Sequence, residues 1–282
     1  AGKALDRFEV AVIIPAYNEA RMVEQCINSV QKAFDYARGP STEGVIIVSD
    51  GGSKDDTAAV ARKAGAVVVE TKADDPRGRG PCLNRGTQRV PEKCRYFLYL
   101  HVDCRLPLNF FVELERFAPT TKDFRIGFCK MRFFPRGGLV LRIFEWLAEF
   151  ESVFSTFGDQ GLIVSKELYQ RLDGFPPQVL LEDVEFLRRA RKIARIHALP
   201  MTLAVSARKF DDRGPLTYMA QCIVVLNLYI FFGWSPSRLL KLYGNPDFLR
   251  LGKGISYVIG TLAFLLVLLL YYRSKNKAGG GV

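Results

Sequence analysis

Tyr99-Leu100-His101-Val102-Asp103-Cys104 continues an apolar aromatic run over 96–100, which is typical of a buried strand. Pro107 follows closely, and because proline is excluded from central strands, this strand has to stop near Asp103. Ligands of open α/β sheets bind at the carboxyl ends of the strands. We therefore expect Asp103 at a ligand-binding edge, where a carboxylate can hold a hard divalent cation. Taken alone, the pattern fits better with an aspartate that caps the next helix, so the rest of the chain has to decide.

Strands and helices alternate on the amino-terminal side of this stretch. A β-branched run over 8–14 predicts the first strand, Pro15 closes it, and an amphipathic helix follows. Further strands are predicted over 45–48 and 66–69, and Gly78-Arg79-Gly80 opens another helix. Such alternation predicts an α/β fold, with a mostly parallel sheet and helices on both faces.

The composition favours an anionic partner. The chain has 282 residues, with 40 Lys and Arg against 29 Asp and Glu, and a formal net charge of +11. Phosphates, a membrane surface or nucleic acid would suit that charge, but no nucleic-acid-binding motif supports the last, so no nucleic acid is expected. The six cysteines form no C-x-x-C pair, which argues against a disulfide framework or a zinc site and favours a reducing compartment.

The pattern changes after the predicted sheet-edge aspartate. Residues 139–154 predict one long helix that faces the core, with contact to a membrane as the alternative. Gly158-Asp159-Gln160-Gly161 predicts a turn before a strand over 162–164. A helix is predicted from Glu182-Asp183 to about Ala194, because acids precede it and basic residues end it, as the helix dipole prefers.

The carboxyl-terminal third is much more apolar. Residues 214–237 carry no charge and predict an interfacial or re-entrant element, with a second membrane span as the alternative. Residues 255–272 are eighteen uncharged residues flanked by basic ones, which predicts a transmembrane helix.

Four stretches together carry a family resemblance. The sequence over about 10–243 resembles the inverting family 2 glycosyltransferases of GT-A fold, and most closely the subgroup described as transferase 2, radical-SAM/selenodomain-associated. In place of the family's usual D-x-D the chain has His101-Val102-Asp103, and the closer subgroup also has His there. The stretches are Val12-Ile13-Ile14-Pro15-Ala16-Tyr17-Asn18-Glu19, Val48-Ser49-Asp50-Gly51-Gly52-Ser53, Leu100-His101-Val102-Asp103, and Gly158-Asp159-Gln160 with Leu181-Glu182-Asp183-Val184-Glu185.

The resemblance implies a domain plan. A Rossmann-like GT-A catalytic domain is expected over 1–213, followed by an apolar or interfacial helical segment over 214–252. The transmembrane helix over 255–272 and a basic, disordered tail over 273–282 lie beyond the resemblance.

The resemblance also implies roles for single residues. Asp183 is expected as the catalytic base with Glu182 beside it, Asp103 as the ligand of Mg²⁺ or Mn²⁺, and Asp159 and Gln160 in the acceptor site. For His101, metal binding and support of the ribose or of Asp103 remain open; strand alternation would put the two side chains on one face. The residues expected to bind the nucleotide-sugar are Pro15, Tyr17, Glu19, Asp50, Arg79, Asn84 and His101.

These expectations describe a membrane-anchored enzyme with a UDP- or GDP-type donor. The catalytic domain is expected on the cytosolic or an equivalent reducing side of a lipid bilayer, with a single-pass carboxyl-terminal anchor and a lipid-linked acceptor. Two alternatives are a sugar nucleotidyltransferase, which should have a glycine-rich loop where Pro15-Ala16-Tyr17-Asn18 stands, and a non-catalytic nucleotide-binding scaffold on a membrane.

Overall fold

The computed structural model describes residues 9–38, 44–135 and 137–243. The chain divides into two compact units, Ala1–Ser206 and Ala207–Val282. The predicted transmembrane helix over 255–272 and the predicted tail over 273–282 lie outside the described residues.

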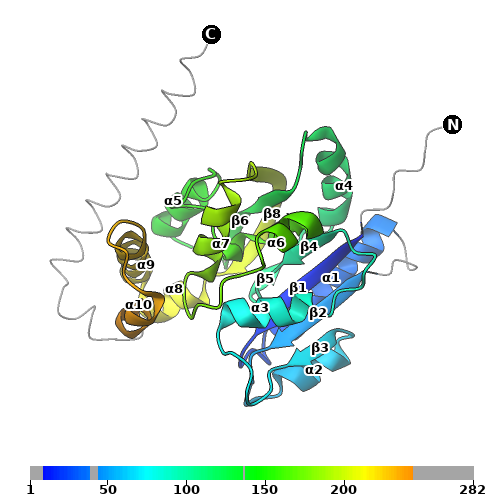
Figure 1. The fold of residues 1–282 in the computed structure, drawn as a ribbon, viewed down its shortest axis with the longest axis horizontal. Coiled ribbons are helices and arrows are strands. Elements are labelled where there is room, and N and C mark those ends of the chain that lie inside the picture. The colour runs from blue at the N-terminus through cyan, green and yellow to red at the C-terminus, as the bar shows by residue number, and fades with distance from the viewer. Residues whose placement is uncertain (1–8, 39–43, 136, 244–282) are drawn as a thin grey trace, which may run out of the picture. The chain divides into compact units, whose positions relative to one another are not determined.

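Eight strands of the described residues form one sheet in the order β3-β2-β1-β4-β7-β6-β8-β5 (Figure 1). They are β1 (Val10–Ala16), β2 (Val45–Asp50), β3 (Val67–Glu70), β4 (Tyr96–Tyr99), β5 (Cys104–Arg105), β6 (Ile126–Phe134), β7 (Leu162–Ser165) and β8 (His197–Ser206). The first four strands are mutually parallel, as predicted. In the other half β6 and β8 are parallel, whereas β4–β7, β6–β7 and β5–β8 pair antiparallel.

Helices cover both faces of this sheet. On one face α3 packs on β1 and β2 and contacts α7, and on the other α1 contacts α2 and α4 (Figure 1). Since both faces are covered, β1 is a continuous apolar run, and Val12, Ile13 and Ile14 are fully buried. The helices of this unit are α1 (Val23–Arg38), α2 (Thr57–Lys63), α3 (Arg79–Thr87), α4 (Phe110–Thr120), α5 (Leu139–Leu147), the 3₁₀ turn η1 (Gly158–Gln160), α6 (Lys166–Arg171) and α7 (Glu182–Ala190).

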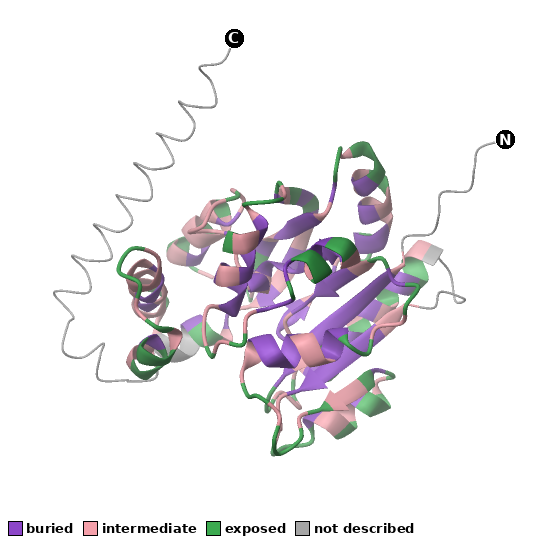
Figure 2. Ribbon diagram, in the orientation of Figure 1, coloured by how far each residue is buried: buried purple, intermediate pink, exposed green. Residues whose placement is uncertain are grey.

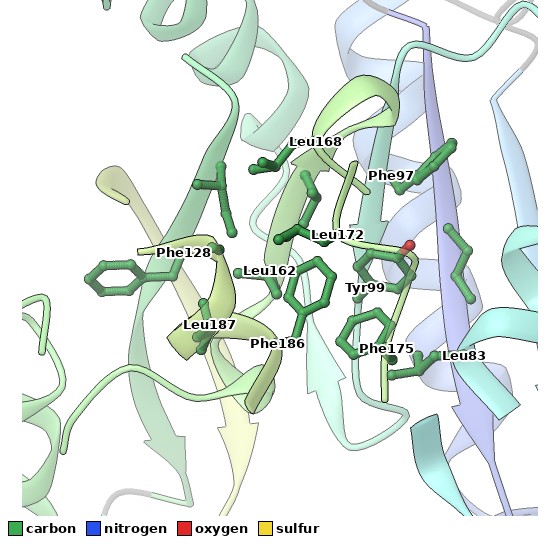
Figure 3. Packing of buried hydrophobic residues seen from close by; sticks show 14 of the residues in the cluster. Leu83, Phe97, Tyr99, Phe128, Leu162, Leu168, Leu172, Phe175, Phe186 and Leu187 are labelled. Atoms are coloured by element: carbon green, nitrogen blue, oxygen red, sulfur yellow. The ribbon is translucent and has the colours of Figure 1, made fainter. Parts of the chain in front are cut away.

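The α3–α6–α7 side of the sheet carries an aromatic core. Phe186 is fully buried and stacks on Phe175, with ring centroids 4.4 Å apart, and Tyr99 of β4 meets Phe175 edge-on at 4.8 Å. Figure 3 shows the side chains of Phe186, Phe175 and Tyr99 close together beside the strands. Figure 2 shows that the central strands are buried and that the helices are exposed on their outer sides. This core fixes the start of α7 against β4.

The predicted helix over 139–154 is wrong in its length, because α5 ends at Leu147. Beyond this point side chains take some of the carbonyls that a continued helix would use. The Gln160 amide donates to the carbonyl of Ala148 at 2.7 Å, and the Ser155 hydroxyl donates to the carbonyl of Phe150 at 2.6 Å. Serine and threonine compete with helical hydrogen bonding in this way, and residues 148–157 form turns instead.

The second unit is helical where it is described, with α8 (Arg208–Arg213), α9 (Pro215–Ile230) and α10 (Pro236–Tyr243). Gly214, at φ 80°, precedes Pro215, which starts α9 at the position where proline's missing N–H is harmless. The Gln221 amide donates to the carbonyl of Tyr243 at 2.8 Å and joins α9 to α10. Over the described part of the chain, no helix combines the length and apolarity needed to cross a membrane.

Candidate active site

The candidate site lies at the edge where β1, β2 and β4 end. Ala16 pairs with Asp50 in the parallel register, so the loops after β1 and β2 start side by side. Because β7 runs antiparallel to β4, with Tyr99 opposite Leu162, the turn η1 just before β7 comes to the same edge. Residues that are far apart in the sequence therefore gather around the carboxyl ends of the parallel strands.

The loops after β1 and β2 form one hydrogen-bonded surface. The Gly51 amide donates to the carbonyl of Ala16 at 2.8 Å, and Asn18, at φ 53°, accepts from the Lys54 amide at 2.8 Å. Tyr17 projects from this surface with 54% of its area exposed. An exposed aromatic ring on a rigid, doubly anchored loop can stack on a planar ligand.

Asp50 is buried at the root of this surface. Its Oδ2 accepts from the amides of Gly52 at 3.0 Å and Ser53 at 2.9 Å, while the Ser53 hydroxyl donates to Oδ1. The three donors fix the carboxylate in one orientation. Glu19 is only half-buried, and its amide donates to the Thr57 hydroxyl at 2.8 Å.

Arg79 is the half-buried centre of a charge cluster that joins α3, α7 and the segment after β4. Its Nε donates to Glu182 Oε1, one terminal nitrogen lies 3.0 Å from Asp183 Oδ2, and the other lies 2.9 Å from His101 Nε2. Since a guanidinium can only donate, His101 Nε2 must be the acceptor, and the proton of the neutral ring is on Nδ1. The same four residues line one small pocket together with Gly158.

Asp183 is held more completely than Glu182. Its Oδ2 also accepts from the Gly158 amide at 2.8 Å, and its Oδ1 accepts from the Val184 amide at 2.9 Å. Burial alone would raise the pKa of the Asp183 carboxyl, but Arg79 and these amides outweigh burial and hold that pKa below its usual value. Burial dominates at Glu182 and raises its pKa despite Arg79. Asp183 is thus the more acidic carboxyl group of the pair.

The two acids keep the side chain of Arg79 positively charged. Burial lowers its pKa, but the carboxylates of Glu182 and Asp183 raise it further, so the guanidinium stays charged. Asp159, half-buried in η1, adds to the same effect. Sequence reasoning assigned Arg79 to a phosphate and missed that it contacts both acids, which stand about a hundred positions away.

The expected strand geometry around Asp103 is wrong. Strand β4 ends at Tyr99, and residues 101–104 form a turn in which the Cys104 amide donates to the carbonyl of His101 at 3.0 Å. Strand alternation therefore does not apply to His101 and Asp103. The Asp103 carboxylate is buried, with the residue 4% exposed, and it helps burial to raise the pKa of the Cys26 thiol. A buried carboxylate at the strand end fits the hard-oxygen preference of Mg²⁺ or Mn²⁺.

A cation on the Asp103 carboxylate would need further coordinating atoms from a bound ligand. Within the described ranges, no three His, Cys, Asp or Glu side chains are grouped so that they could hold a metal ion. His101 Nε2 is engaged by Arg79. A cation on Asp103 would therefore complete its coordination with ligand oxygens and waters, which is usual for Mg²⁺.

Two expected site residues have structural contacts that compete with a ligand. The Asn84 amide donates to the carbonyl of Phe175 at 2.8 Å, and its oxygen accepts from the Tyr169 hydroxyl and the Phe175 amide. Gln160 is fully buried, with its oxygen on the Phe157 amide and its nitrogen on the carbonyl of Ala148. Asn84 thus anchors the loop before α7, and Gln160 fixes η1 to the end of α5.

The backbone before the acid pair is strained, which the sequence did not reveal. Leu181 immediately precedes Glu182 and adopts the left-handed conformation at φ 60°, which is uncommon for leucine. The Gln178 amide holds it there by donating to the carbonyls of Leu180 and Leu181 at 3.0 and 2.7 Å. This turn starts α7 with both acids facing Arg79.

Comparison with known proteins identifies the family. The family model described as Glycosyl transferase family 2 matches residues 11–154, just over half of the chain. No curated protein sequence matches the chain.

The fold is similar to solved structures at low sequence identity. TarS 1–349 of S. aureus in complex with UDP matches with a TM-score of 0.56 and 20% identity, over 77% of this chain and 65% of that chain. The mannosyltransferase PcManGT of Pyrobaculum calidifontis in complex with GDP-Man and Mn²⁺ matches with a TM-score of 0.60 and 17% identity, over 97% and 76% of the two chains. At these identities the likeness shows the fold.

Proposed function

Because the chain belongs to glycosyl transferase family 2 and is a glycosyltransferase, we propose that it inverts the anomeric carbon as it moves a sugar from a UDP- or GDP-type donor to an acceptor hydroxyl or phosphate. The observation that carries this proposal is the cluster of Arg79 with the buried acids Glu182 and Asp183 at the carboxyl edge of the sheet. It supplies an ionised carboxylate beside a permanent cation. The family membership also decides against a sugar nucleotidyltransferase and a non-catalytic scaffold.

The donor is proposed to lie across the loops after β1 and β2. Tyr17 offers an exposed ring for the base, and Asp50 a fixed carboxylate that can accept from a base N–H. Pro15 and Glu19 flank this surface. The UDP in the S. aureus TarS structure and the GDP-Man in the PcManGT structure support a nucleotide-sugar donor without choosing its base.

A divalent cation fits beside the diphosphate. PcManGT was solved with Mn²⁺, and here Asp103 would hold Mg²⁺ or Mn²⁺ together with diphosphate oxygens. Such a cation, when bound, would stabilise the negative charge of the departing nucleoside diphosphate. His101 contacts Arg79 through Nε2 and so helps to position it.

Asp183 is proposed as the base. When an acceptor hydroxyl attacks the anomeric carbon, its proton moves to a carboxylate oxygen of Asp183. The Gly158 and Val184 amides hold that carboxylate in place, and Arg79 donates to the neighbouring Glu182. Asp159, in the same turn as Gly158, is proposed to contact the acceptor.

The membrane part of the proposal rests on the sequence. The uncharged residues 255–272, the net charge of +11 and the apolar residues 214–237 favour a protein held at a bilayer. A lipid-linked acceptor fits that placement. The supply of nucleotide-sugars and the absence of a C-x-x-C pair favour a catalytic domain on the cytosolic or equivalent reducing side. The His of His101-Val102-Asp103 also supports the likeness to the radical-SAM/selenodomain-associated subgroup.

A ligand panel tests the donor. Thermal unfolding is measured with UDP-GlcNAc, UDP-glucose, GDP-mannose and the free diphosphates UDP and GDP, each with and without Mn²⁺. We expect stabilisation by one base class, dependent on Mn²⁺ and lost in Asp103→Asn, because bound ligand stabilises the folded state. Stabilisation of Asp103→Asn equal to the wild type's would remove Asp103 from the cation site.

A further inference from the structure

We propose that Arg79 couples donor binding to the base: it holds Asp183 and Glu182 while the donor is absent and turns toward the donor diphosphate when it binds. Asp183 then gains base strength only in the donor complex. This inference rests on the proposed function, in which Asp183 is the base and the donor carries a diphosphate.

The first argument is that one guanidinium holds both acids. Its three nitrogens face Glu182, Asp183 and His101, one each. The second N–H group of each terminal nitrogen can still donate to a diphosphate oxygen. The negative charge of a diphosphate bound there competes with the two carboxylates for the same guanidinium.

The second argument is accessibility. The side chain of Arg79 is 35% exposed, whereas those of Glu182 and Asp183 are 2% and 9% exposed. An anion that enters from solvent thus meets the guanidinium before it meets either acid. Arg79 is also the first residue of α3, whose preceding residue is Gly78 at φ 117°, and no side chain caps this helix. The start of a helix attracts phosphate, so the ligand and the guanidinium are drawn to the same place.

The third argument is electrostatic. Besides Arg79, the groups that face the Asp183 carboxylate are Glu182 on its own helix, His101 after β4, and Asp159 and the Gly158 amide in η1. Arg79 is the permanent cation among them. When it turns to a phosphate, Asp183 keeps its amide donors but loses this cation and faces Glu182, so its pKa rises. A carboxylate with a higher pKa is a stronger base.

Isothermal calorimetry measures this shift without turnover. UDP and, separately, GDP are titrated with Mn²⁺ into the full chain at pH 5.0, in two buffers of different ionisation enthalpy, and the difference gives the protons taken up. The wild type is expected to take up more protons per ligand than Asp183→Asn, because a carboxyl group whose pKa rises binds more protons at this pH. Arg79→Gln should lose this excess, because Asp183 then has no cation to release.

Arg85→Gln is the matched control. Arg85 lies on the same helix, but its terminal nitrogens donate to the carbonyl of Pro76 and the Thr71 hydroxyl, away from the acids. Arg85→Gln should therefore show the same excess proton uptake as the wild type. Arg79→Lys keeps the positive charge but has fewer hydrogen-bond donors, so its excess proton uptake should be smaller than that of the wild type. This variant replaces Arg79→Gln in the experiment if Arg79→Gln does not fold.

The outcomes separate this inference from the function on which it rests. Binding of UDP or GDP to the wild type with no proton uptake beyond that of Asp183→Asn contradicts the coupling and leaves the glycosyl transfer proposal intact. An excess that persists unchanged in Arg79→Gln or Arg79→Lys contradicts it as well. If neither diphosphate binds, the proposed donor class fails and the coupling fails with it.

Discussion

Asp183 and Glu182 share one arginine, yet their carboxyl pKa values move in opposite directions. The difference comes from the backbone, because Asp183 accepts from the Gly158 and Val184 amides in addition to its contact with Arg79. Burial raises the pKa of Glu182 more than Arg79 lowers it. One acid of the pair is thereby kept ionised, as a base at neutral pH has to be.

Gly158→Ala is expected to impair the base. An added Cβ would lie 3.0 Å from both Cβ and Oδ2 of Asp183, so the carboxylate would have to move away from the amide. Displacement of a reacting group by a fraction of an ångström to 1 Å can reduce turnover by about 10- to 100-fold. The measurement is kcat together with the melting temperature.

Gly138→Ala is the control for this change, because a Cβ there meets nothing within 4 Å. Its kcat should match the wild type's. A Gly158→Ala variant with the same kcat would show that the Gly158 contact does not position the base.

The ionised Asp183 carboxylate is expected to contribute to the free energy of unfolding, and this contribution should disappear at acidic pH. Its folded pKa is lowered, so its contribution is present above the unfolded value of 3.8 and disappears as the pH falls through the folded pKa. Each unit of lowering corresponds to about 1.4 kcal/mol. Urea unfolding of the wild type and Asp183→Asn at pH 2 to 6 should give a stability difference that shrinks below about pH 4. A difference that stays constant over this range would contradict the lowered pKa.

At the scale of elements, sequence patterns predicted the strands that carry continuous apolar runs and missed those that depend on distant partners. β1, β2, β3 and β4 overlap their predicted ranges, because each is an apolar run closed by a turn signal. β5 has two residues and exists through its pairing with β8. The helix predicted over 139–154 was too long. The spacing of apolar residues does not show that the Gln160 side chain donates to the carbonyl of Ala148 just after α5.

Gln160→Ala should destabilise the fold more than it impairs binding. The buried amide bonds the Phe157 amide and the carbonyl of Ala148, and its loss leaves both groups unpaired beside a cavity. A loss of about 2–4 kcal/mol is expected from unsatisfied buried groups and lost volume.

Gln170→Ala provides the exposed counterpart on α6 and should stay within about 0.5 kcal/mol of the wild type. Urea unfolding measures both variants. Equal stability of the two would mean that Gln160 does not hold the turn, and would return it to the acceptor site.

For the whole molecule, the order of motifs predicted the core fold and the sheet edge to which the candidate residues come, but not the contacts among them. Asp50, Asp103 and Glu182–Asp183 follow from strand ends and a helix start, which local patterns reveal. The contact between Arg79 and the acids joins positions about a hundred residues apart, and no periodicity encodes it. The change from parallel to antiparallel pairing at β7 likewise depends on which strand is adjacent in space.

Deletion of 255–282 is expected to release the protein from membranes. The full chain should sediment with vesicles of phosphatidylcholine and phosphatidylglycerol, because eighteen uncharged residues suit a bilayer core about 30 Å thick. The truncated chain should remain in the supernatant at 0.5 M salt, where attraction of the basic surface is screened. Sedimentation of the truncated chain under these conditions would move the anchor to residues 214–237.

The central claim is that Asp183 is the base of the glycosyl transfer. The release of nucleoside diphosphate by Asp183→Asn tests this claim most directly. With the donor that stabilises the wild type and a polyprenyl phosphate or simple alcohol acceptor, the variant should bind the donor normally while turnover falls by at least about 10²-fold, the usual scale for loss of a general base. Turnover within twofold of the wild type, at equal donor affinity, would contradict the assignment of Asp183 as the base.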